Sequence, residues 1–214
     1  APPVVDLGPD TFVCAASSLL LDAGQGAGFY FWKPDSSLSD TTIYNPIATP
    51  SKNIIYKVTA FNLICPVSDS IFVKVISPPV VYLGEDTTLC RGDKLLLDAG
   101  NTGMVYAWSD NVTGKIDTVA EAGAYFVTVK NPEGCSSSDT IIVTIDDYPS
   151  GLDLGADKII CLQQNILLSA IAGPYKYLWS TGDSTSSITV NKEGKFIVKV
   201  SNGNCVSQDS INLS

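Results

Sequence analysis

Apolar and polar residues alternate in short segments along most of the chain. Two neighbouring segments show the pattern clearly, with apolar side chains at Tyr125, Val127 and Val129 and then at Ile141, Val143 and Ile145. A period of two residues is typical of a β-strand with one buried face. Turn-forming residues separate such segments, as at 131–134 and 202–204. No segment has a helical period of useful length, so the sequence predicts an all-β chain.

The chain also repeats itself three times. Three tryptophans each follow a cysteine by 18 residues: Cys14 and Trp32, Cys90 and Trp108, Cys161 and Trp179. Each repeat has Leu-Gly-x-Asp before its first cysteine, Tyr-x-Trp at the tryptophan, and a second cysteine followed four residues later by an aspartate. The second cysteines are Cys65, Cys135 and Cys205. Repetition of this kind predicts a stack of similar modules.

Short proline-bearing segments mark the junctions between these modules. They lie at 77–79 and 146–151, which places the modules at 1–77, 78–147 and 148–214. Several short strands with turns between them are typical of a β-sandwich. The first module has seven extra residues around 45–50. We expect an edge loop there, with a contact loop as the alternative.

The charge and the residue types exclude several functions. The net charge is −9 and only 13 residues are basic, which disfavours nucleic acid and anionic membrane surfaces as partners. No apolar stretch approaches the length of a membrane span, so we expect no membrane insertion. The chain has no histidine, which excludes a Ser-His-Asp site. We therefore predict a protein that is not an enzyme and that needs no cofactor.

Six evenly distributed cysteines indicate an oxidising compartment. Zinc is the weaker interpretation, because the chain has no C-x-x-C pair and no histidine. We expect a secreted protein at the cell surface, and Ala1-Pro2-Pro3 has the character of a mature or trimmed start.

The repeated motifs resemble a known kind of protein. They are most complete at 106–109 (Tyr-Ala-Trp-Ser), 122–125 (Ala-Gly-Ala-Tyr) and 134–135 (Gly-Cys), and they recur at 179–182 and 194–196. This pattern resembles the immunoglobulin-like and PKD-like repeats of secreted Bacteroidetes surface proteins, including gliding-motility adhesins and type IX secretion cargo. The first module departs from it at Lys33-Pro34. The resemblance implies three tandem immunoglobulin-like β-sandwich modules on display outside the cell, in a stalk or adhesive role.

The same template raises a question about the disulfides. It places the first cysteine of a module near one end of the sandwich and the second cysteine in a hairpin at the other end. Either the strands are laid out differently or the bonds cross between modules, because bonded cysteines need Cα atoms within about 7 Å. Regular pairing within each repeat is our expectation: Cys14–Cys65, Cys90–Cys135 and Cys161–Cys205.

Other repeated residues have alternative interpretations. We expect Trp32, Trp108, Trp179, Tyr30, Tyr106 and Tyr177 to be core anchors instead of sugar-stacking platforms. We expect Asp10, Asp86 and Asp157 to bond the backbone of turns, with calcium as the weaker alternative. The resemblance also makes an O-glycan signal relevant, which the sequence offers at Thr41, Ser70, Thr87, Thr118, Thr140, Ser184 and Ser210. The alternative is that Thr at these places only favours strands.

These observations predict a non-enzymatic extracellular repeat array that serves as a stalk, an adhesin segment or a fibre subunit. Its expected partners are further copies in a filament, neighbouring repeats of a longer chain, or surface glycans. The alternative function is a carbohydrate-binding accessory region of a secreted polysaccharide-degrading enzyme, which an exposed aromatic platform would support. An enzyme comes third, and an acidic cleft between modules would favour it.

Overall fold

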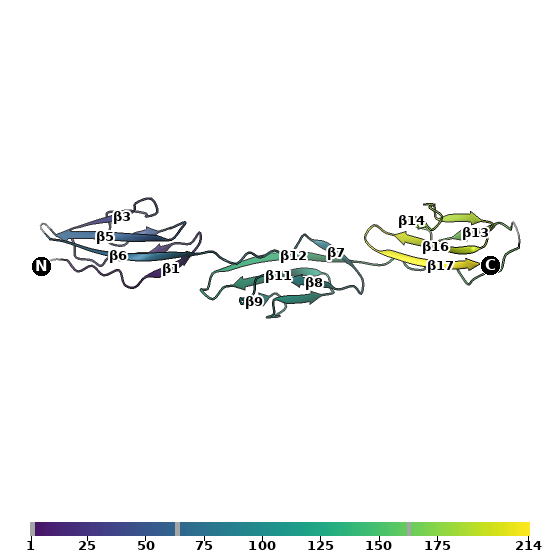
Figure 1. Cartoon of the computed structure of the whole chain (residues 1–214), viewed down its shortest axis with the longest axis horizontal. Helices are drawn as coiled ribbons and strands as arrows, with labels where there is room; N and C mark the ends of the chain where they lie inside the picture. The colour runs from purple at the N-terminus through teal and green to yellow at the C-terminus, as the bar shows by residue number, and fades with distance from the viewer. Residues whose placement is uncertain (1–2, 63–64, 162–163) are drawn as a thin grey trace. The chain divides into compact units, whose positions relative to one another are not determined.

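The computed structural model describes residues 3–62, 65–161 and 164–214. Every regular element in these ranges is a β-strand (Figure 1). These residue ranges contain no helix that is long and apolar enough to cross a membrane. The chain divides into two compact units, Ala1–Val81 with Gly100–Ala107 and Thr128–Ser138, and Tyr82–Ala99 with Trp108–Val127 and Asp139–Ser214. The module boundaries expected from the sequence stay a prediction.

The first repeat contains a four-stranded and a two-stranded sheet. Its strands are β1 (Thr11–Cys14), β2 (Leu19–Leu20), β3 (Phe29–Lys33), β4 (Ile47–Ala48), β5 (Ile54–Asn62) and β6 (Cys65–Ile76). The larger sheet has the order β1-β6-β5-β3, and β2 pairs with β4. β1 runs parallel to β6, with Cys14 opposite Ile76 at the far end of β6. The other pairings are antiparallel.

The second repeat has the same layout. Its strands are β7 (Thr87–Cys90), β8 (Leu95–Asp98), β9 (Val105–Trp108), β10 (Ile116–Val119), β11 (Gly123–Lys130) and β12 (Ser136–Asp146). The larger sheet has the order β7-β12-β11-β9, and β10 pairs with β8. β7 is again parallel to the last strand, with Cys90 opposite Asp146.

The third repeat has a three-stranded sheet in the order β14-β16-β17, and β13 pairs with β15. Its strands are β13 (Ile166–Ser169), β14 (Lys176–Trp179), β15 (Ser187–Val190), β16 (Gly194–Ser201) and β17 (Val206–Leu213). The place of β1 and β7 is taken by a single parallel bridge between Lys158 and Leu213. Antiparallel pairing accounts for the rest of the repeat.

Both sheets of a repeat supply one core. In the third repeat, Leu168 and Ile188 from the smaller sheet cluster with Trp179, Val198 and Val200 from the larger sheet. The intervening Lys199 is exposed, as the period of two predicts. In the first repeat, one cluster combines residues of both sheets in the same way. The predicted fold class, all-β with three tandem immunoglobulin-like sandwiches, is confirmed.

The extra residues of the first repeat lie mainly before β4, and their expected place around 45–50 is wrong. Ala48 of β4 pairs with Leu19 as Val119 of β10 pairs with Leu95, so β4 is the counterpart of β10 and is not itself inserted. The Tyr44 carbonyl accepts the N–H of Ala23, as the Lys115 carbonyl does in the second repeat. Most of the extra residues therefore lie between Trp32 and Tyr44, where Leu38 bridges to Ala48.

Candidate functional site

Two disulfides join different repeats. Cys14 of the first repeat is bonded to Cys135 of the second, and Cys90 of the second is bonded to Cys205 of the third. The Cα atoms are 5.6 Å apart in each pair, within the range for a disulfide. In both cases the first cysteine of one repeat meets the second cysteine of the following repeat. These junctions are the most specific chemical feature of the chain.

The expected pairing within repeats, Cys14–Cys65, Cys90–Cys135 and Cys161–Cys205, is therefore wrong. The physical reason is the position of β1 at the end of β6 remote from Cys65. Cys14 lies opposite Ile76 at the end of β6, whereas Cys65 is the first residue of that strand. The eleven intervening steps span roughly 35 Å at about 3.3 Å per residue, far beyond the reach of a disulfide. Cys65 and Cys161, both expected to be bonded, are exposed free thiols.

An asparagine in each hairpin ties the second cysteine to the linker before it. At the first junction, Asn131 donates from its side chain to the Ser77 carbonyl at 3.4 Å and accepts the main-chain N–H of Cys135 at 2.8 Å. At the second junction, Asn202 donates to the Asp147 carbonyl at 2.9 Å and accepts the N–H of Cys205 at 2.8 Å. Cys135 and Cys205 are 1% and 0% exposed. The junction thus covers the second cysteine of each pair.

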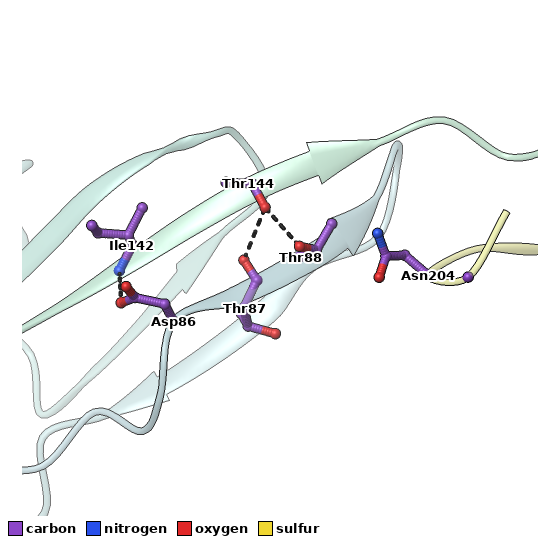
Figure 2. A pocket seen from close by; sticks show the side chains of 7 residues that line it. Asp86, Thr87, Thr88, Ile142, Thr144 and Asn204 are labelled. Atoms are coloured by element: carbon purple, nitrogen blue, oxygen red, sulfur yellow. Dashed lines mark hydrogen bonds between the residues drawn. The ribbon is translucent and has the colours of Figure 1, made fainter.

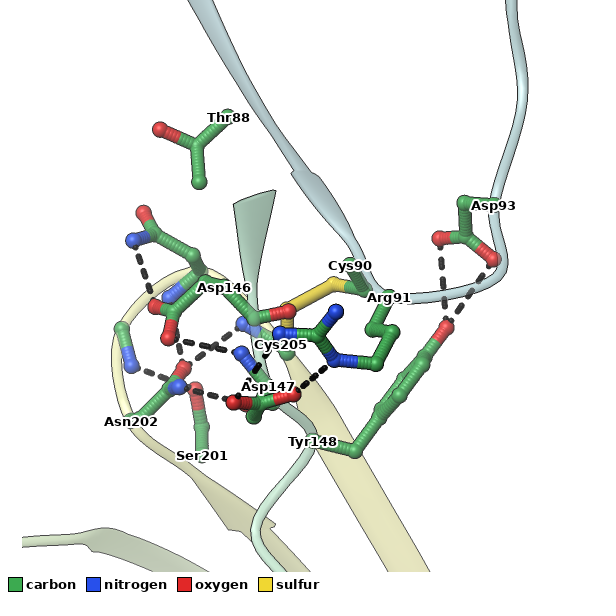
Figure 3. Close-up of a disulfide and its surroundings, with 12 residues drawn as sticks. Thr88, Cys90, Arg91, Asp93, Asp146, Asp147, Tyr148, Ser201, Asn202 and Cys205 are labelled. Atoms are coloured by element: carbon green, nitrogen blue, oxygen red, sulfur yellow. Dashed lines mark hydrogen bonds and ion pairs between the residues drawn. A yellow bond between two sulfur atoms is a disulfide. The ribbon is translucent and has the colours of Figure 1, made fainter. Parts of the chain in front are cut away.

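Charged and polar side chains surround the second disulfide (Figure 3). Arg91, next to Cys90, forms an ion pair with Asp147 of the linker, and the hydrogen bond from Arg91 lowers the pKa of that carboxyl. Both side chains are largely exposed, so the pair adds little stability. The next linker residue, Tyr148, donates its hydroxyl to Asp93 at 3.1 Å, and this hydrogen bond raises the pKa of the tyrosine. These contacts hold the linker beside the turn that follows Cys90.

The repeated aspartates fasten the start of each repeat to its last strand. The carboxylates of Asp10, Asp86 and Asp157 accept the main-chain N–H groups of Phe72, Ile142 and Asn212 at 2.9, 2.8 and 2.8 Å. The aspartates after the second cysteines complete the connection, because Asp69, Asp139 and Asp209 accept the N–H groups of Leu7, Leu83 and Leu154. Within the described residues no group of three or more His, Cys, Asp or Glu lies together as a metal site. The calcium interpretation gains no support.

The repeated aromatic residues lie inside. Trp32, Trp108 and Trp179 are 1%, 4% and 2% exposed, and each indole N–H donates to a main-chain carbonyl at 2.8 Å. Tyr106 is buried, and Tyr30 and Tyr177 are partly buried against the cores. All three tyrosine hydroxyls donate to carbonyls, those of Gly24, Asn101 and Ile171. These positions leave no stacking face for a sugar.

Phenylalanines that the sequence reasoning did not single out are exposed instead. Phe29 and Phe31 on β3 and Phe61 on β5 are 60%, 50% and 37% exposed, and the rings of Phe29 and Phe61 stack with centroids 5.5 Å apart. The alternation in β3 carried the signal, because Tyr30 and Trp32 face inward and so place Phe29 and Phe31 outward.

The candidate O-glycan positions differ in accessibility. Ser70, Thr118, Thr140 and Ser184 are exposed, and Thr41, Thr87 and Ser210 are partly buried. Glycosylation stays a prediction at all seven positions.

A shallow polar groove lies beside the second junction (Figure 2). It is lined by Asp86, Thr87, Thr88, Ile142, Thr144, Gly203 and Asn204. Its polar groups are bonded within the groove: Thr88 and Thr144 share a hydrogen bond of 2.7 Å, and the Asp86 carboxylate accepts the main-chain N–H of Ile142. The groove therefore presents neither a nucleophile with a base nor a pair of free carboxylates.

Comparison with known proteins finds similarity only among solved structures. No family model and no curated protein matches the chain. A three-domain fragment of titin carrying Glu-to-Ala changes is 13% identical, with 100% of this chain and 98% of that chain covered and a TM-score of 0.37. Extracellular domains 3–5 of Drosophila OTK are 10% identical over 100% and 97% of the two chains, with a TM-score of 0.41. The eight N-terminal Ig domains of Down Syndrome Cell Adhesion Molecule are 13% identical over 100% and 42%, with a TM-score of 0.40. At these values the similarity does not indicate what this chain binds or does.

Proposed function

We propose that this chain is a non-enzymatic extracellular structural array, a fibre subunit whose disulfides carry mechanical load between successive repeats. The observation that carries the proposal is that both disulfides join one repeat to the next. A disulfide whose only task is to stabilise a small domain closes a loop inside that domain. Here the covalent links lie at the junctions, where a peptide linker already connects the repeats.

The extracellular part of this proposal rests on redox chemistry. Disulfides persist in oxidising compartments and are rare in the cytosol. Acidic, Ser- and Thr-rich surfaces keep such an array soluble. The origin in a Bacteroidetes secretion system and the stalk and adhesin roles remain predictions from the sequence resemblance.

The two covalent loops overlap, and this overlap defines the load path. Cys90 lies between Cys14 and Cys135 in the sequence, and Cys135 lies between Cys90 and Cys205. Tension applied at the two ends passes from Cys14 to Cys135, back along the backbone to Cys90, and on to Cys205. Residues 15–89 and 136–204 lie outside this path. The two disulfides thus keep these loops, which make up the greater part of the chain, from being extended under tension.

Single-molecule force spectroscopy tests the proposal. The oxidised chain, held at its termini, should reach a fully extended length of about 70 residues, roughly 240 Å at about 3.5 Å per residue. The reduced chain should extend over all 214 residues, roughly 750 Å. A matched control with Cys14→Ser and Cys90→Ser should extend like the reduced chain without any reductant. Full extension of the oxidised wild-type chain would contradict the proposal.

A glycan-binding accessory region is the second candidate, favoured by the exposed stacked pair of Phe29 and Phe61. Aromatic faces of this kind can stack on sugar rings. Retention on insoluble polysaccharides should then fall when Phe29 and Phe61 are changed to Ser and should survive the change of the exposed Leu20, on the smaller sheet, to Ser. Equal retention of all three proteins would exclude this face as a binding platform.

A further inference from the structure

Two cysteines take no part in the junction disulfides, and one is a first cysteine of its repeat while the other is a second cysteine. Cys161 is the first cysteine of the third repeat and Cys65 is the second cysteine of the first repeat, and both are exposed free thiols. We propose that Cys161 of one copy forms a disulfide with Cys65 of a second copy, which joins copies head to tail into a covalent filament. This inference rests on the proposed structural function and names its partner as a second copy of the same chain.

Cys161 makes the same main-chain hydrogen bond as the bonded first cysteines. After Cys14 and Cys90 the chain turns, and the carbonyl of each cysteine accepts the N–H of the third residue on, Ser17 at 3.0 Å and Asp93 at 2.9 Å. The Cys161 carbonyl accepts the N–H of Gln164 at 3.0 Å in the same way. The first cysteine of the third repeat therefore shares the hydrogen bond that accompanies bonding in the other two repeats.

Cys65 likewise lies in the same hairpin position as the bonded second cysteines. Asn131 and Asn202 donate their main-chain N–H groups to the carbonyls of Cys135 and Cys205 across the turn. In the first repeat, Asn62 of β5 pairs with Cys65 of β6. Asn62 thus occupies the position of Asn131 and Asn202, and its side-chain oxygen accepts the N–H of Gly28 at 2.7 Å. The first repeat therefore has a hairpin asparagine and a second cysteine at the places that the other two repeats use for bonding.

The surroundings of Cys65 and Cys161 are more exposed than those of the bonded cysteines. Cys135 and Cys205 are 1% and 0% exposed because the preceding repeat covers them, whereas Cys65 is exposed. Ile159, two residues before Cys161, is 90% exposed. The residues that enter the second repeat, Pro78-Pro79-Val80-Val81, also recur as Pro2-Pro3-Val4-Val5 ahead of the first repeat. The first repeat therefore has both the entry sequence and the uncovered cysteine of a repeat that follows another.

The geometry favours a polymer over a closed pair. Both bonds inside the chain join a first-cysteine turn to a second-cysteine hairpin, and neither joins two elements of the same kind. A contact between two different surfaces of the same chain is heterologous, and it propagates as an open filament unless it closes into a ring. After each addition, the filament would still have one free Cys65 at one end and one free Cys161 at the other.

Bond formation requires an oxidant, and a small-molecule disulfide such as oxidised glutathione supplies it. The Cys161 thiolate attacks oxidised glutathione, forms a mixed disulfide and releases one reduced glutathione. The Cys65 thiolate of the second copy then attacks the Cys161 sulfur and releases the second glutathione. Two thiols are oxidised, one glutathione disulfide is reduced, and the two protons leave with the glutathione thiols.

The test uses purified chain with both internal disulfides formed, incubated at mildly alkaline pH in a glutathione redox buffer. Wild-type protein should give a ladder of oligomers on non-reducing gels, and the ladder should collapse to monomer on reduction. Variants C65S and C161S should each stay monomeric. A mixture of the two variants should give a dimer and nothing larger, because C65S supplies Cys161 and C161S supplies Cys65. Peptide mapping of that dimer should find a Cys65–Cys161 linkage.

Three outcomes would overturn the proposal: a wild-type chain that stays monomeric with two titratable thiols, a monomer carrying an internal Cys65–Cys161 bond, or either single variant dimerising as well as the mixture. Peptide mapping of each variant for Cys14–Cys135 and Cys90–Cys205 shows that folding is intact. The force measurement distinguishes the two proposals. A chain that stays monomeric in the redox buffer and still reaches an extended length of only about 70 residues would refute the polymer and support the load-bearing array.

Discussion

Cys14 and Cys135 are 121 residues apart in the sequence and 5.6 Å apart between Cα atoms, joined by a disulfide. The bond connects the turn after the first strand of one repeat to the hairpin before the last strand of the next. The same relationship holds between Cys90 and Cys205. A pairing that occurs twice within one chain is a property of the repeat itself.

Removal of the first junction disulfide should destabilise the protein strongly. A disulfide that closes a loop of about 120 residues lowers the entropy of the unfolded chain. In the chain-entropy model this stabilises the folded protein by up to about 5 kcal/mol. The double change Cys14→Ser and Cys135→Ser should therefore lower the free energy of urea unfolding by several kcal/mol. The matched control, Cys65→Ser with Cys161→Ser, replaces as many cysteines and should leave the monomer's unfolding unchanged. Equal losses in the two proteins would show that the junction bond has no special role.

The asparagine at the second junction should contribute separately from the disulfide. Asn202→Ala removes the bond to the Asp147 carbonyl and the bond from the Cys205 N–H. We expect a loss of about 1–2 kcal/mol in the free energy of unfolding. Asn165→Ala, at an exposed position, serves as the control. Hydrogen exchange at the Cys205 amide should also accelerate in Asn202→Ala, and an unchanged exchange rate would count against the clamp.

Asp117 should oppose folding at neutral pH. It is 5% exposed, and its Oδ2 has no hydrogen-bond partner among the described residues. Burial raises its pKa above the ordinary 3.8, and the repulsion of Asp110 adds to this effect. Because the folded pKa is raised, the wild type is most stable with Asp117 protonated and loses stability as pH rises through that pKa. The equivalent residue of the third repeat is the apolar Ile188.

The change Asp117→Asn removes this titration. We expect the variant to be more stable than the wild type at pH 7 by about 1 kcal/mol, or about 3 °C in Tm. The advantage should vanish below about pH 4, where the wild-type carboxyl is protonated in both states. Thermal scans across this pH range provide the measurement, with Asp35→Asn as an exposed control. A variant that gains nothing at pH 7 would contradict the assignment.

The repeated aspartates should act through hydrogen bonds and not through calcium. Asp86→Ala should lower the free energy of unfolding by about 1 kcal/mol, because the Ile142 N–H loses its acceptor. Asp86→Asn keeps an acceptor oxygen at the same place and should recover most of this loss. Addition of calcium or of EDTA should leave Tm unchanged in all three proteins. A calcium-dependent rise in the wild type that Asp86→Asn abolishes would revive the metal interpretation.

Local features of the fold were predictable, and the pairing of distant segments was not. The alternation of Val198, Lys199 and Val200 indicates a half-buried strand without further information. The partner of β1 is different, because Cys14 lies opposite Ile76 only through a parallel pairing between segments about 60 residues apart. No local pattern distinguishes that arrangement from an antiparallel one. The choice between pairing within and between repeats depends on where β1 lies along β6.

The functional side chains divide in the same way. Burial of Trp108 follows from its place in an alternating strand, where the indole needs only a nearby carbonyl, that of Gly114. The role of Asn202 could not be predicted, since turn residues of this type are common in any hairpin. Its comparison with Asn62 and Asn131 offered a signal, because all three precede a second cysteine by three or four residues. The spacing indicates a role for the asparagine only once the structure shows that its side chain donates to a carbonyl of the linker.

Disulfide mapping of the native protein is the most direct test of the central claim. The protein is digested without reduction after its free thiols have been blocked, and the linked peptides are identified by mass spectrometry. Peptides joining Cys14 to Cys135 and Cys90 to Cys205 are the predicted result. Peptides joining Cys14 to Cys65, Cys90 to Cys135 and Cys161 to Cys205 would contradict the account, because each repeat would then be closed on itself and no covalent load path would connect one repeat to the next.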